Sequence, residues 1–265
     1  TDPIWSRVDD LDDRALFQKH VQAKELLIKV AIEREKVRRV RLNMPPFISR
    51  LNAQALTIGF ARRFASYKRG DLIFSDMERL ERILESAGGP VQFIFAGKAH
   101  PADREGQRIL KRVYEASQDT LLKGRVLLIE DYDIEIGRAL VQGVDVWLNN
   151  PRRPKEASGT SGMKVAMNGG LNLSILDGWW PEGFNGQNGW SIGDERVYGS
   201  PEAQDAADLE SLYQRLENEV IPLFFDAVDG VPLKWTSMMK QAIGSCTPAF
   251  HSDRQVIDYV RHIYT

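Results

Sequence analysis

Short apolar runs alternate with amphipathic stretches along most of the chain beyond residue 50. The runs are rich in β-branched residues and cover 55–60, 91–96, 126–129, 144–148 and 171–176. The first three begin about 35 residues apart, which is the length of a β-α-β unit. Near-continuous apolar strands that alternate with helices are typical of parallel sheets covered on both faces. The pattern therefore predicts an α/β fold with a doubly wound, Rossmann-like parallel sheet and helices on both faces.

The amphipathic stretches predict the helices of this fold. They cover 71–87, 104–118, 134–142, 206–220, 233–243 and 252–264. The segment 178–199 is instead rich in Gly, Trp, Asn and Asp. We expect it to form a surface loop that carries large aromatic rings.

The first part of the chain has a different character. Residues 10–42 are highly charged, lack Pro and Gly, and place apolar residues three and four positions apart, which predicts one or two long helices. Pro45 and Pro46 end this stretch, because Pro lacks a backbone N–H and disfavours helix in the residue before it. We therefore divide the chain into a helical segment over 1–49, packed on the domain that it precedes, and a Rossmann-like domain over 50–265 with C-terminal helices.

Composition narrows the possible functions. The 265 residues are 43% hydrophobic and 27% charged, as in ordinary globular proteins. The formal net charge of −2 provides no overall positive field, so we expect no nucleic-acid partner. No stretch resembles a signal peptide or a membrane-spanning helix, so we expect no membrane partner. Cys246 is the single cysteine, which excludes an intramolecular disulfide and favours a cytoplasmic location.

Basic residues gather where the first two strands are predicted to end. Arg62, Arg63, Lys68 and Arg69 follow the first run, and Lys98 follows the second. Ligands of doubly wound sheets bind at the carboxyl ends of the strands, and Arg and Lys both bind phosphate. The first turn is therefore a candidate phosphate site, although a solvated charged face explains it equally well. For the second turn, solvation is the favoured interpretation.

The third turn is acidic. Glu130-Asp131-Tyr132-Asp133 follows the third run. No cluster of His or Cys accompanies these acids, so we expect Asp131 or Asp133 to cap the next helix and we expect no metal site. Tyr132 fits either a core position or a ring stacked on a planar ligand, and the sequence alone favours the core.

The segment 151–164 is the most informative part of the chain. Gly, Ser and Thr crowd before a predicted helix at 163–168, so that backbone N–H groups at the helix N-terminus can bind an anion. The spacing matches neither a Walker A loop nor the dinucleotide-binding glycine motif. Glu156 could be a general acid, an acceptor for sugar hydroxyls or a cap. Lys164 is either an ordinary surface residue, which the residues alone favour, or a buried amine able to condense with an aldehyde.

This segment also carries a family resemblance. Residues 156–164, Glu-Ala-Ser-Gly-Thr-Ser-Gly-Met-Lys, with Asn168-Gly169-Gly170, resemble the cofactor segment of the α-glucan (glycogen, starch and maltodextrin) phosphorylases. Further matches follow in the family's order: the basic turn at 62–69, Gly97-Lys98-Ala99, Glu130-Asp131-Tyr132, and Ser252-Asp253-Arg254 with Tyr259. The resemblance covers nearly all of 50–265. The stretches 151–154 and 177–180 are similar to the bacterial and archaeal members.

The resemblance implies that Lys164 carries pyridoxal 5'-phosphate as a Schiff base. The other implied cofactor contacts are Arg62, Lys68, Thr160 and Gly162 at the cofactor phosphate, and Tyr132 at the ring. The implied substrate contacts are Arg63 and Lys68 at inorganic phosphate, and Glu156, Ser158 and Gly159 at the glucose hydroxyls. Catalytic roles are implied for Lys68, Arg63 and Glu156.

The implied reaction is the reversible phosphorolysis of terminal α-1,4-glucosidic bonds, which gives glucose 1-phosphate with retained configuration. The implied partners are an α-1,4-glucan, inorganic phosphate or glucose 1-phosphate, and an N-terminal domain. Members of the family have two Rossmann-like domains in a GT-B arrangement, and the present chain corresponds to the second. We therefore expect the isolated chain to be inactive, and a homodimer is left open.

The chain also departs from the family pattern. Ala65-Ser66 stand where the family has His-Glu, and Asp133 stands where it has Arg. These changes put the allosteric control of the animal type in doubt more than they affect the chemistry.

Two other functions remain open at this stage. A nucleotide-sugar glucosyltransferase would share the fold but would leave Lys164 without a covalent partner. A non-catalytic carbohydrate-binding module would instead stack sugar on Trp179, Trp180 and Trp190.

Overall fold

The described part of the chain forms a single six-stranded sheet. The computed structural model describes residues 3–46, 49–120, 122 and 124–264. The strands are β1 (Leu56–Ala61), β2 (Val91–Ala96), β3 (Val126–Ile129), β4 (Val146–Asn149), β5 (Leu171–Ile175) and β6 (Gly189–Ile192). All neighbours pair in parallel, in the order β3-β2-β1-β4-β5-β6. This is the strand order of doubly wound folds, so the predicted fold class is confirmed.

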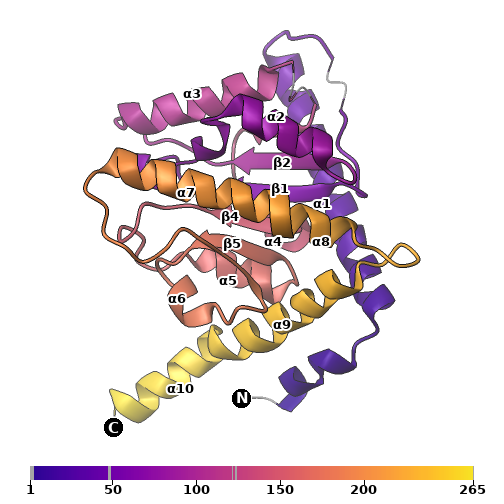
Figure 1. Ribbon diagram of the computed structural model, residues 1–265, viewed down its shortest axis with the longest axis vertical. Coiled ribbons are helices and arrows are strands. Elements are labelled where there is room, and N and C mark those ends of the chain that lie inside the picture. Colours follow the sequence, from indigo (N-terminus) through magenta and orange to yellow (C-terminus); the bar gives the residue numbers. More distant parts are fainter. Residues whose placement is uncertain (1–2, 47–48, 121, 123, 265) are drawn as a thin grey trace.

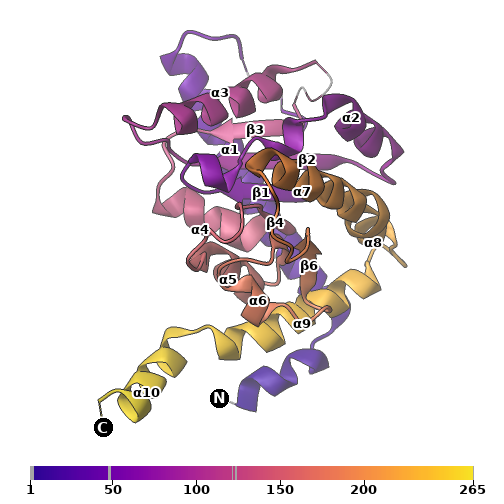
Figure 2. The same cartoon turned by 60° about the vertical axis from the view of Figure 1, so that its left-hand side comes forward.

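Helices cover both faces of this sheet (Figures 1 and 2). They are α1 (Asp13–Arg41), α2 (Met77–Ser86), α3 (Arg104–Gln118), α4 (Ile134–Gly143), α5 (Thr160–Met167), α6 (Trp180–Gly183), α7 (Pro201–Arg215), α8 (Ile221–Phe225), α9 (Leu233–Ala249) and α10 (Ser252–His262). Along β1, Leu56, Ile58 and Phe60 point into the layer formed with α2, α3 and α7. The small residue Ala61 faces the layer of α1, α4 and α5 instead.

Aspartate and serine side chains fix where several helices begin. The carboxylate of Asp76 accepts a hydrogen bond from the N–H of Arg79, so α2 begins at residue 77 rather than at the expected residue 71. Ser200 caps α7 in the same way. Asp133 accepts from the N–H of Ile136 and caps α4, which confirms the role expected for one of the two aspartates of that turn.

The prediction of a surface loop over 178–199 is confirmed for residues 193–199 but is wrong for the part that carries the aromatic rings. This segment contains α6 and the edge strand β6, and Trp179, Trp180 and Trp190 are only 3%, 0% and 5% exposed. The rings pack on one another and on Trp235, and the indole N–H of Trp180 donates to the carbonyl of Trp190. Burial of such large apolar surfaces outweighs the turn propensity of the neighbouring Gly and Asn. The three rings therefore offer no face on which a sugar could stack.

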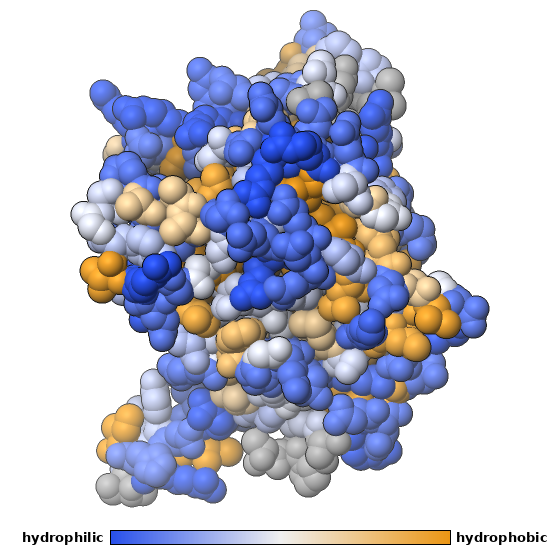
Figure 3. Space-filling view, in the orientation of Figure 1, coloured by the Kyte–Doolittle hydropathy of each residue, from blue (hydrophilic) through white to orange (hydrophobic). Residues whose placement is uncertain are grey.

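The two terminal helical regions differ in how they meet the domain. One long helix, α1, forms most of the N-terminal region and packs along α4. At the other end of the chain, α10 contains no buried residue and carries apolar side chains on its surface at the lower left of Figure 3. In the described part of the chain, no helix has the length and apolar character needed to cross a membrane.

Candidate functional site

A cavity of about 850 Å³ lies at the carboxyl ends of the first three strands, where the sequence predicts a ligand. Its walls come from the turns after β1, β2 and β3 and from the first turn of α5. The lining residues are Ala61, Arg62, Arg63, Tyr67, Lys68, Gly97, Lys98, Ala99, His100, Pro101, Tyr132, Gly159, Thr160, Ser161 and Lys164. The tertiary structure thus brings together four segments that are widely separated in the sequence.

The N-terminus of α5 faces this cavity. Gly159 precedes the helix with a φ of 89°, a left-handed conformation that Gly adopts readily, and no side chain caps this end. The first N–H groups of a helix have no partner within the helix, and the helix dipole adds positive potential there. The wall formed by Thr160 and Ser161 is therefore suited to an anion such as phosphate.

The structure distinguishes Gly162 from these two residues. Gly162 is buried against Asn172 and Trp179, and its N–H donates to the carbonyl of Gly159 at 3.3 Å. It does not line the cavity, whereas Ser161 does. Sequence reasoning missed Ser161 because a stretch of small residues does not reveal which one the helix geometry turns outward.

Three exposed cations line the same cavity. They are Arg63, Lys98 and Lys164, and none of them forms an ion pair with another described residue. Lys164 is therefore not drawn into the interior, but it shares one cavity with Arg62 and Arg63. Lys98 also belongs to this group, although its sequence favoured a solvated loop. Three unpaired positive charges around one cavity attract an anionic ligand.

Two further cations are held by one carboxylate. The Oε2 atom of Glu156 lies 2.8 Å from Nη2 of Arg62 and 2.9 Å from Nζ of Lys68. Burial lowers the pKa of the Arg62 guanidinium, and the charge of Glu156 opposes that shift. Arg62 also donates to the side-chain oxygen of Asn149 at the end of β4. Glu156 thus pairs with two cations, which is none of the three roles considered from the sequence.

Residues 156–159 form a strap that leads into α5, and the segment after β5 holds this strap through two hydrogen bonds. The backbone N–H of Glu156 donates to Oδ2 of Asp177 at 2.8 Å, and the carbonyl of Ser158 accepts from the N–H of Trp179 at 2.9 Å. Ser158 is half-buried and does not line the cavity, whereas Gly159 does. Of the residues with predicted roles at glucose, Gly159 lines the cavity, whereas Glu156 and Ser158 lie beside it in the chain without lining the cavity.

Tyr132 stands at the cavity wall rather than wholly in the core. Its ring is half-buried and packs at the edge of the core layer formed by α1 and α4. Burial raises the pKa of its hydroxyl, and the neighbouring charge of Asp133 raises it further. An aromatic ring in this position can lie against a planar ligand in the cavity. Among the described residues, no cluster of His, Cys, Asp and Glu is arranged to hold a metal ion.

Arg69 has a structural role that its place in the basic turn does not reveal. Its guanidinium is 3% exposed, donates to the carbonyls of Asn150 and Pro151, and forms an ion pair with Asp208 at 2.8 Å. These contacts tie the turn after β1 to the segment that leads toward α5. In the sequence, Arg69 is indistinguishable from neighbours such as Arg62, because only the fold decides which cation faces inward.

Comparisons with known proteins find relatives of this chain. A family model described as carbohydrate phosphorylase matches residues 11–182. The chain is 49% identical to a glycogen phosphorylase of Aquifex aeolicus, over 99% of this chain and 38% of that protein. It is 47% identical to a maltodextrin phosphorylase of Thermococcus litoralis, over 99% of this chain and 31% of that protein.

A more distant relative matches a similar share of this chain. The chain is 37% identical to a glycogen phosphorylase of Mycobacterium tuberculosis, over 98% of this chain and 31% of that protein. The chain thus spans about a third of the length of the curated relatives it matches. The family model covers more than half of the chain and includes every residue predicted for the site. The chain belongs to the carbohydrate phosphorylase family.

Proposed function

We propose that this chain is the cofactor-bearing part of an α-1,4-glucan phosphorylase. Such an enzyme is a glycosyltransferase that moves the terminal glucose of an α-1,4-glucan to inorganic phosphate and releases glucose 1-phosphate with retained configuration. The relatives named glycogen or maltodextrin phosphorylase support this proposal. The observation that carries it is the meeting of Lys164, an uncapped helix N-terminus and unpaired cations in one cavity.

Pyridoxal phosphate fits the residues that surround this cavity. Lys164 supplies an exposed primary amine able to condense with the cofactor aldehyde, and Thr160 and Ser161 supply N–H groups for its phosphate. Tyr132, on the turn after β3, provides an aromatic ring at the cavity wall. When bound, the cofactor supplies a phosphate group that can exchange a proton with the substrate phosphate. We assign the other basic residues at the cavity to balancing the negative charge of the cofactor phosphate and the substrate phosphate.

The protein's contribution is electrostatic. Two phosphate groups repel each other, and positive charges close to both of them offset this repulsion. Such charges act more strongly where water is excluded. Arg62 and Lys68 are largely buried and keep their orientation through Glu156, so they are suited to the inner phosphate. Arg63 is exposed and unpaired on the same wall, so we assign it to inorganic phosphate, which must enter and leave.

The glucose being transferred is assigned to the margin formed by the strap before α5. Glu156 retains a second carboxylate oxygen, and Ser158 and Gly159 offer polar groups beside it. Hydroxyl groups of a sugar need such fixed donors and acceptors for orientation. We also propose that a further domain of the parent protein covers the open side of the cavity and excludes water from it. We place the parent protein in the cytoplasm, because Cys246 is a buried free thiol.

The decisive experiment identifies the covalent site in the full-length protein. We expect Schiff-base absorbance in the purified protein, and borohydride reduction followed by peptide mass spectrometry should place the label on Lys164. The Lys164→Ala variant should lose the absorbance together with release of glucose 1-phosphate from maltodextrin and phosphate. Lys155→Ala is the matched control, because Lys155 is exposed in the same segment but does not line the cavity.

Two outcomes would contradict the proposal. One is a wild-type protein that takes up no pyridoxal phosphate. The other is calorimetric binding of ADP-glucose or UDP-glucose with Lys164 unmodified, which would indicate a nucleotide-sugar glucosyltransferase. We expect the isolated 265-residue chain to release no glucose 1-phosphate, because half of the proposed cleft lies outside it.

A further inference from the structure

Four carboxylates lie close to Tyr132 in the sequence, three in the turn between β3 and α4 and one in the first turn of α4. They belong to Glu130, Asp131, Asp133 and Glu135. Four like charges within six positions repel one another, and such a turn needs cations to hold a single conformation. Tyr132 is the one residue of this group that lines the cavity with Lys164.

The required cations come from one face of α1. Arg34, Arg38 and Arg41 are four and three positions apart, which places them on the same side of the helix. Together they contact all four of these carboxylates. The distances are 2.8 Å for Arg34–Asp133, 2.6 Å for Arg34–Glu135, 2.6 Å for Arg38–Glu130, 2.6 Å for Arg41–Glu130 and 3.3 Å for Arg41–Asp131.

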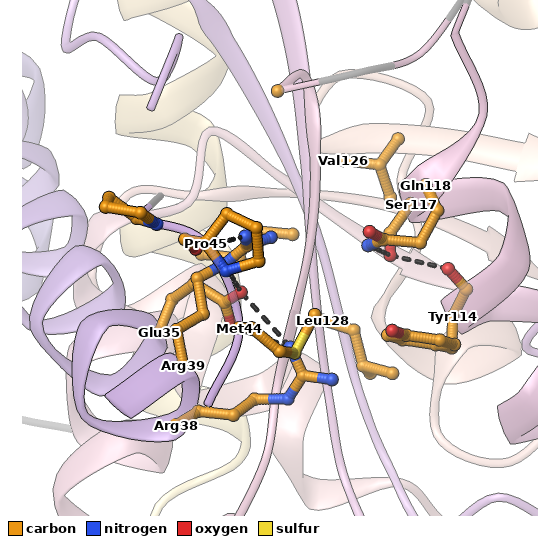
Figure 4. A pocket seen from close by; sticks show the side chains of 13 residues that line it. Glu35, Arg38, Arg39, Met44, Pro45, Tyr114, Ser117, Gln118, Val126 and Leu128 are labelled. Atoms are coloured by element: carbon orange, nitrogen blue, oxygen red, sulfur yellow. Dashed lines mark hydrogen bonds and ion pairs between the residues drawn. The ribbon is translucent and has the colours of Figure 1, made fainter. Parts of the chain in front are cut away.

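The central arginine of this set is well buried. The Arg38 side chain is 9% exposed, pairs with Glu35 of its own helix at 3.2 Å, and stacks 5.2 Å above the Tyr114 ring. Figure 4 shows Arg38 reaching from α1 toward Tyr114 of α3. Isolated surface ion pairs contribute little to stability, but a network anchored by a buried arginine holds its members in place more firmly.

The backbone of the turn needs this support. Asp131 has a φ of 53°, a left-handed conformation that is strained for a residue other than Gly. Such conformations persist where the surroundings fix them. Arg41 holds the carboxylate of Asp131, and Arg34 holds that of Asp133. The residues on both sides of Tyr132 are thus fixed to α1.

We propose that Arg34, Arg38 and Arg41 are positioning residues that fix Tyr132 against the cofactor cavity. This inference rests on the proposed function for its cofactor. It gives α1 a role in the site although none of its residues lines the cavity. Asp133 stands where the phosphorylase family has Arg, and in this chain it forms the ion pair with Arg34.

The first test measures Tyr132 itself in the cofactor-free, full-length protein. Nitration by tetranitromethane is followed at Tyr132 by mass spectrometry, with the exposed Tyr259 of α10 as internal reference. In the Arg34→Gln/Arg41→Gln variant, we expect nitration at Tyr132 to be about 3- to 10-fold faster, because the turn is released, and nitration at Tyr259 to be unchanged. This variant retains the buried Arg38, so we expect it to fold.

The second test uses the protein loaded with pyridoxal phosphate. We expect the double variant to lose cofactor to hydroxylamine about 3- to 10-fold faster and to show a weaker circular-dichroism band of the bound cofactor. The Arg34→Lys/Arg41→Lys variant should retain most of the wild-type behaviour, because it keeps both positive charges. In the Tyr132→Ala background, the same double substitution should have no further effect on the rate, because the residue that it positions is gone.

The matched control is Arg79→Gln. Arg79 of α2 also pairs with two carboxylates, those of Glu210 in α7 and Glu217 just after α7, but it does not line the cavity. The inference is overturned if the double variant matches this control at both readouts. A wild-type protein that takes up no cofactor would refute the proposed function, whereas the nitration test would still decide whether α1 positions Tyr132.

Discussion

The Nζ atom of Lys24 lies 2.7 Å from Oδ2 of Asp145, and neither side chain is exposed to solvent. Lys24 belongs to α1, whereas Asp145 directly precedes β4. The same carboxylate contacts Nε2 of His20 at 3.0 Å and accepts the backbone N–H of Thr57 in β1. A single buried charge network therefore joins the N-terminal helix to the start of two central strands.

Replacing Lys24 should weaken this connection strongly. The Lys24→Met variant leaves the Asp145 carboxylate buried without its main counter-charge, and we expect a loss of about 3–5 kcal/mol in the free energy of unfolding. Urea denaturation measures this loss. Lys29→Met is the control, because Lys29 is exposed on the same helix and should change stability by less than about 0.5 kcal/mol. Equal effects of the two substitutions would contradict a structural role of the pair.

The same pair predicts a pH dependence. Burial by itself would raise the pKa of Asp145, but Lys24 and His20 outweigh burial and hold this pKa below its ordinary value. The folded state therefore binds fewer protons than the unfolded state at acidic pH. The stabilisation is complete above the unfolded-state pKa of about 4 and is lost as the pH falls through the folded-state pKa.

A comparison of two proteins isolates this effect. Without Lys24, burial dominates the pKa of Asp145. Protonation of Asp145 at low pH therefore stabilises the folded state of the variant, whereas it destabilises the folded state of the wild type. We expect the difference in unfolding free energy between wild type and Lys24→Met to narrow between about pH 7 and pH 3. Other acids with lowered pKa values, such as Asp205, titrate alike in both proteins, so their contributions cancel in the difference between the two unfolding free energies. A difference that stays constant over this range would show that Asp145 does not titrate as described.

Glu156→Gln should have opposite effects on stability and on anion binding. The neutral amide pairs less well with Arg62 and Lys68, so we expect the cofactor-free protein to lose about 2 kcal/mol of unfolding free energy. Removal of the negative charge also raises the positive potential of the cavity, so inorganic phosphate should bind several-fold more tightly in calorimetry.

The control for this variant is Glu105→Gln. Glu105 pairs with Arg108 on the exposed face of α3, away from the cavity, and its replacement should leave both quantities almost unchanged. Weaker phosphate binding by Glu156→Gln would contradict this prediction. It would show that the carboxylate is needed mainly to orient Arg62 and Lys68 and that its competition with phosphate for these cations matters less.

Gly178→Ala should disturb the strap beside α5. Gly178 has a φ of 61°, and a Cβ atom there would lie 2.3 Å from the carbonyl oxygen of Ser158. The strap must move away, so we expect lower stability in urea and weaker phosphate binding. Gly186→Ala separates the two causes, because Gly186 has a φ of 82° but nothing within 4 Å of such a Cβ. That control should lose about 1–2 kcal/mol through backbone strain alone, with phosphate binding intact.

The sequence by itself determined the fold class and the family. Apolar runs such as 126–129 are buried on both faces in the observed sheet, because a strand that is apolar at every position must be covered on both sides. The segment 156–164 indicated the phosphorylase resemblance, because its small residues and its Lys are local features that need no fold to be read. Asp133 was likewise predictable as a cap, since capping depends on residues only three positions apart.

The tertiary structure decided what depends on contacts between distant residues. It turned Trp179 and Trp190 inward against the expectation of a loop, because their apolar surface found partners in α9 and the sheet. Among similar cations, it left Arg63 free at the cavity and bound Arg69 to backbone carbonyls. It also joined α1 to the turn around Tyr132. The direction of a side chain and its electrostatic partners follow from the packing of whole elements, which no local pattern of residues specifies.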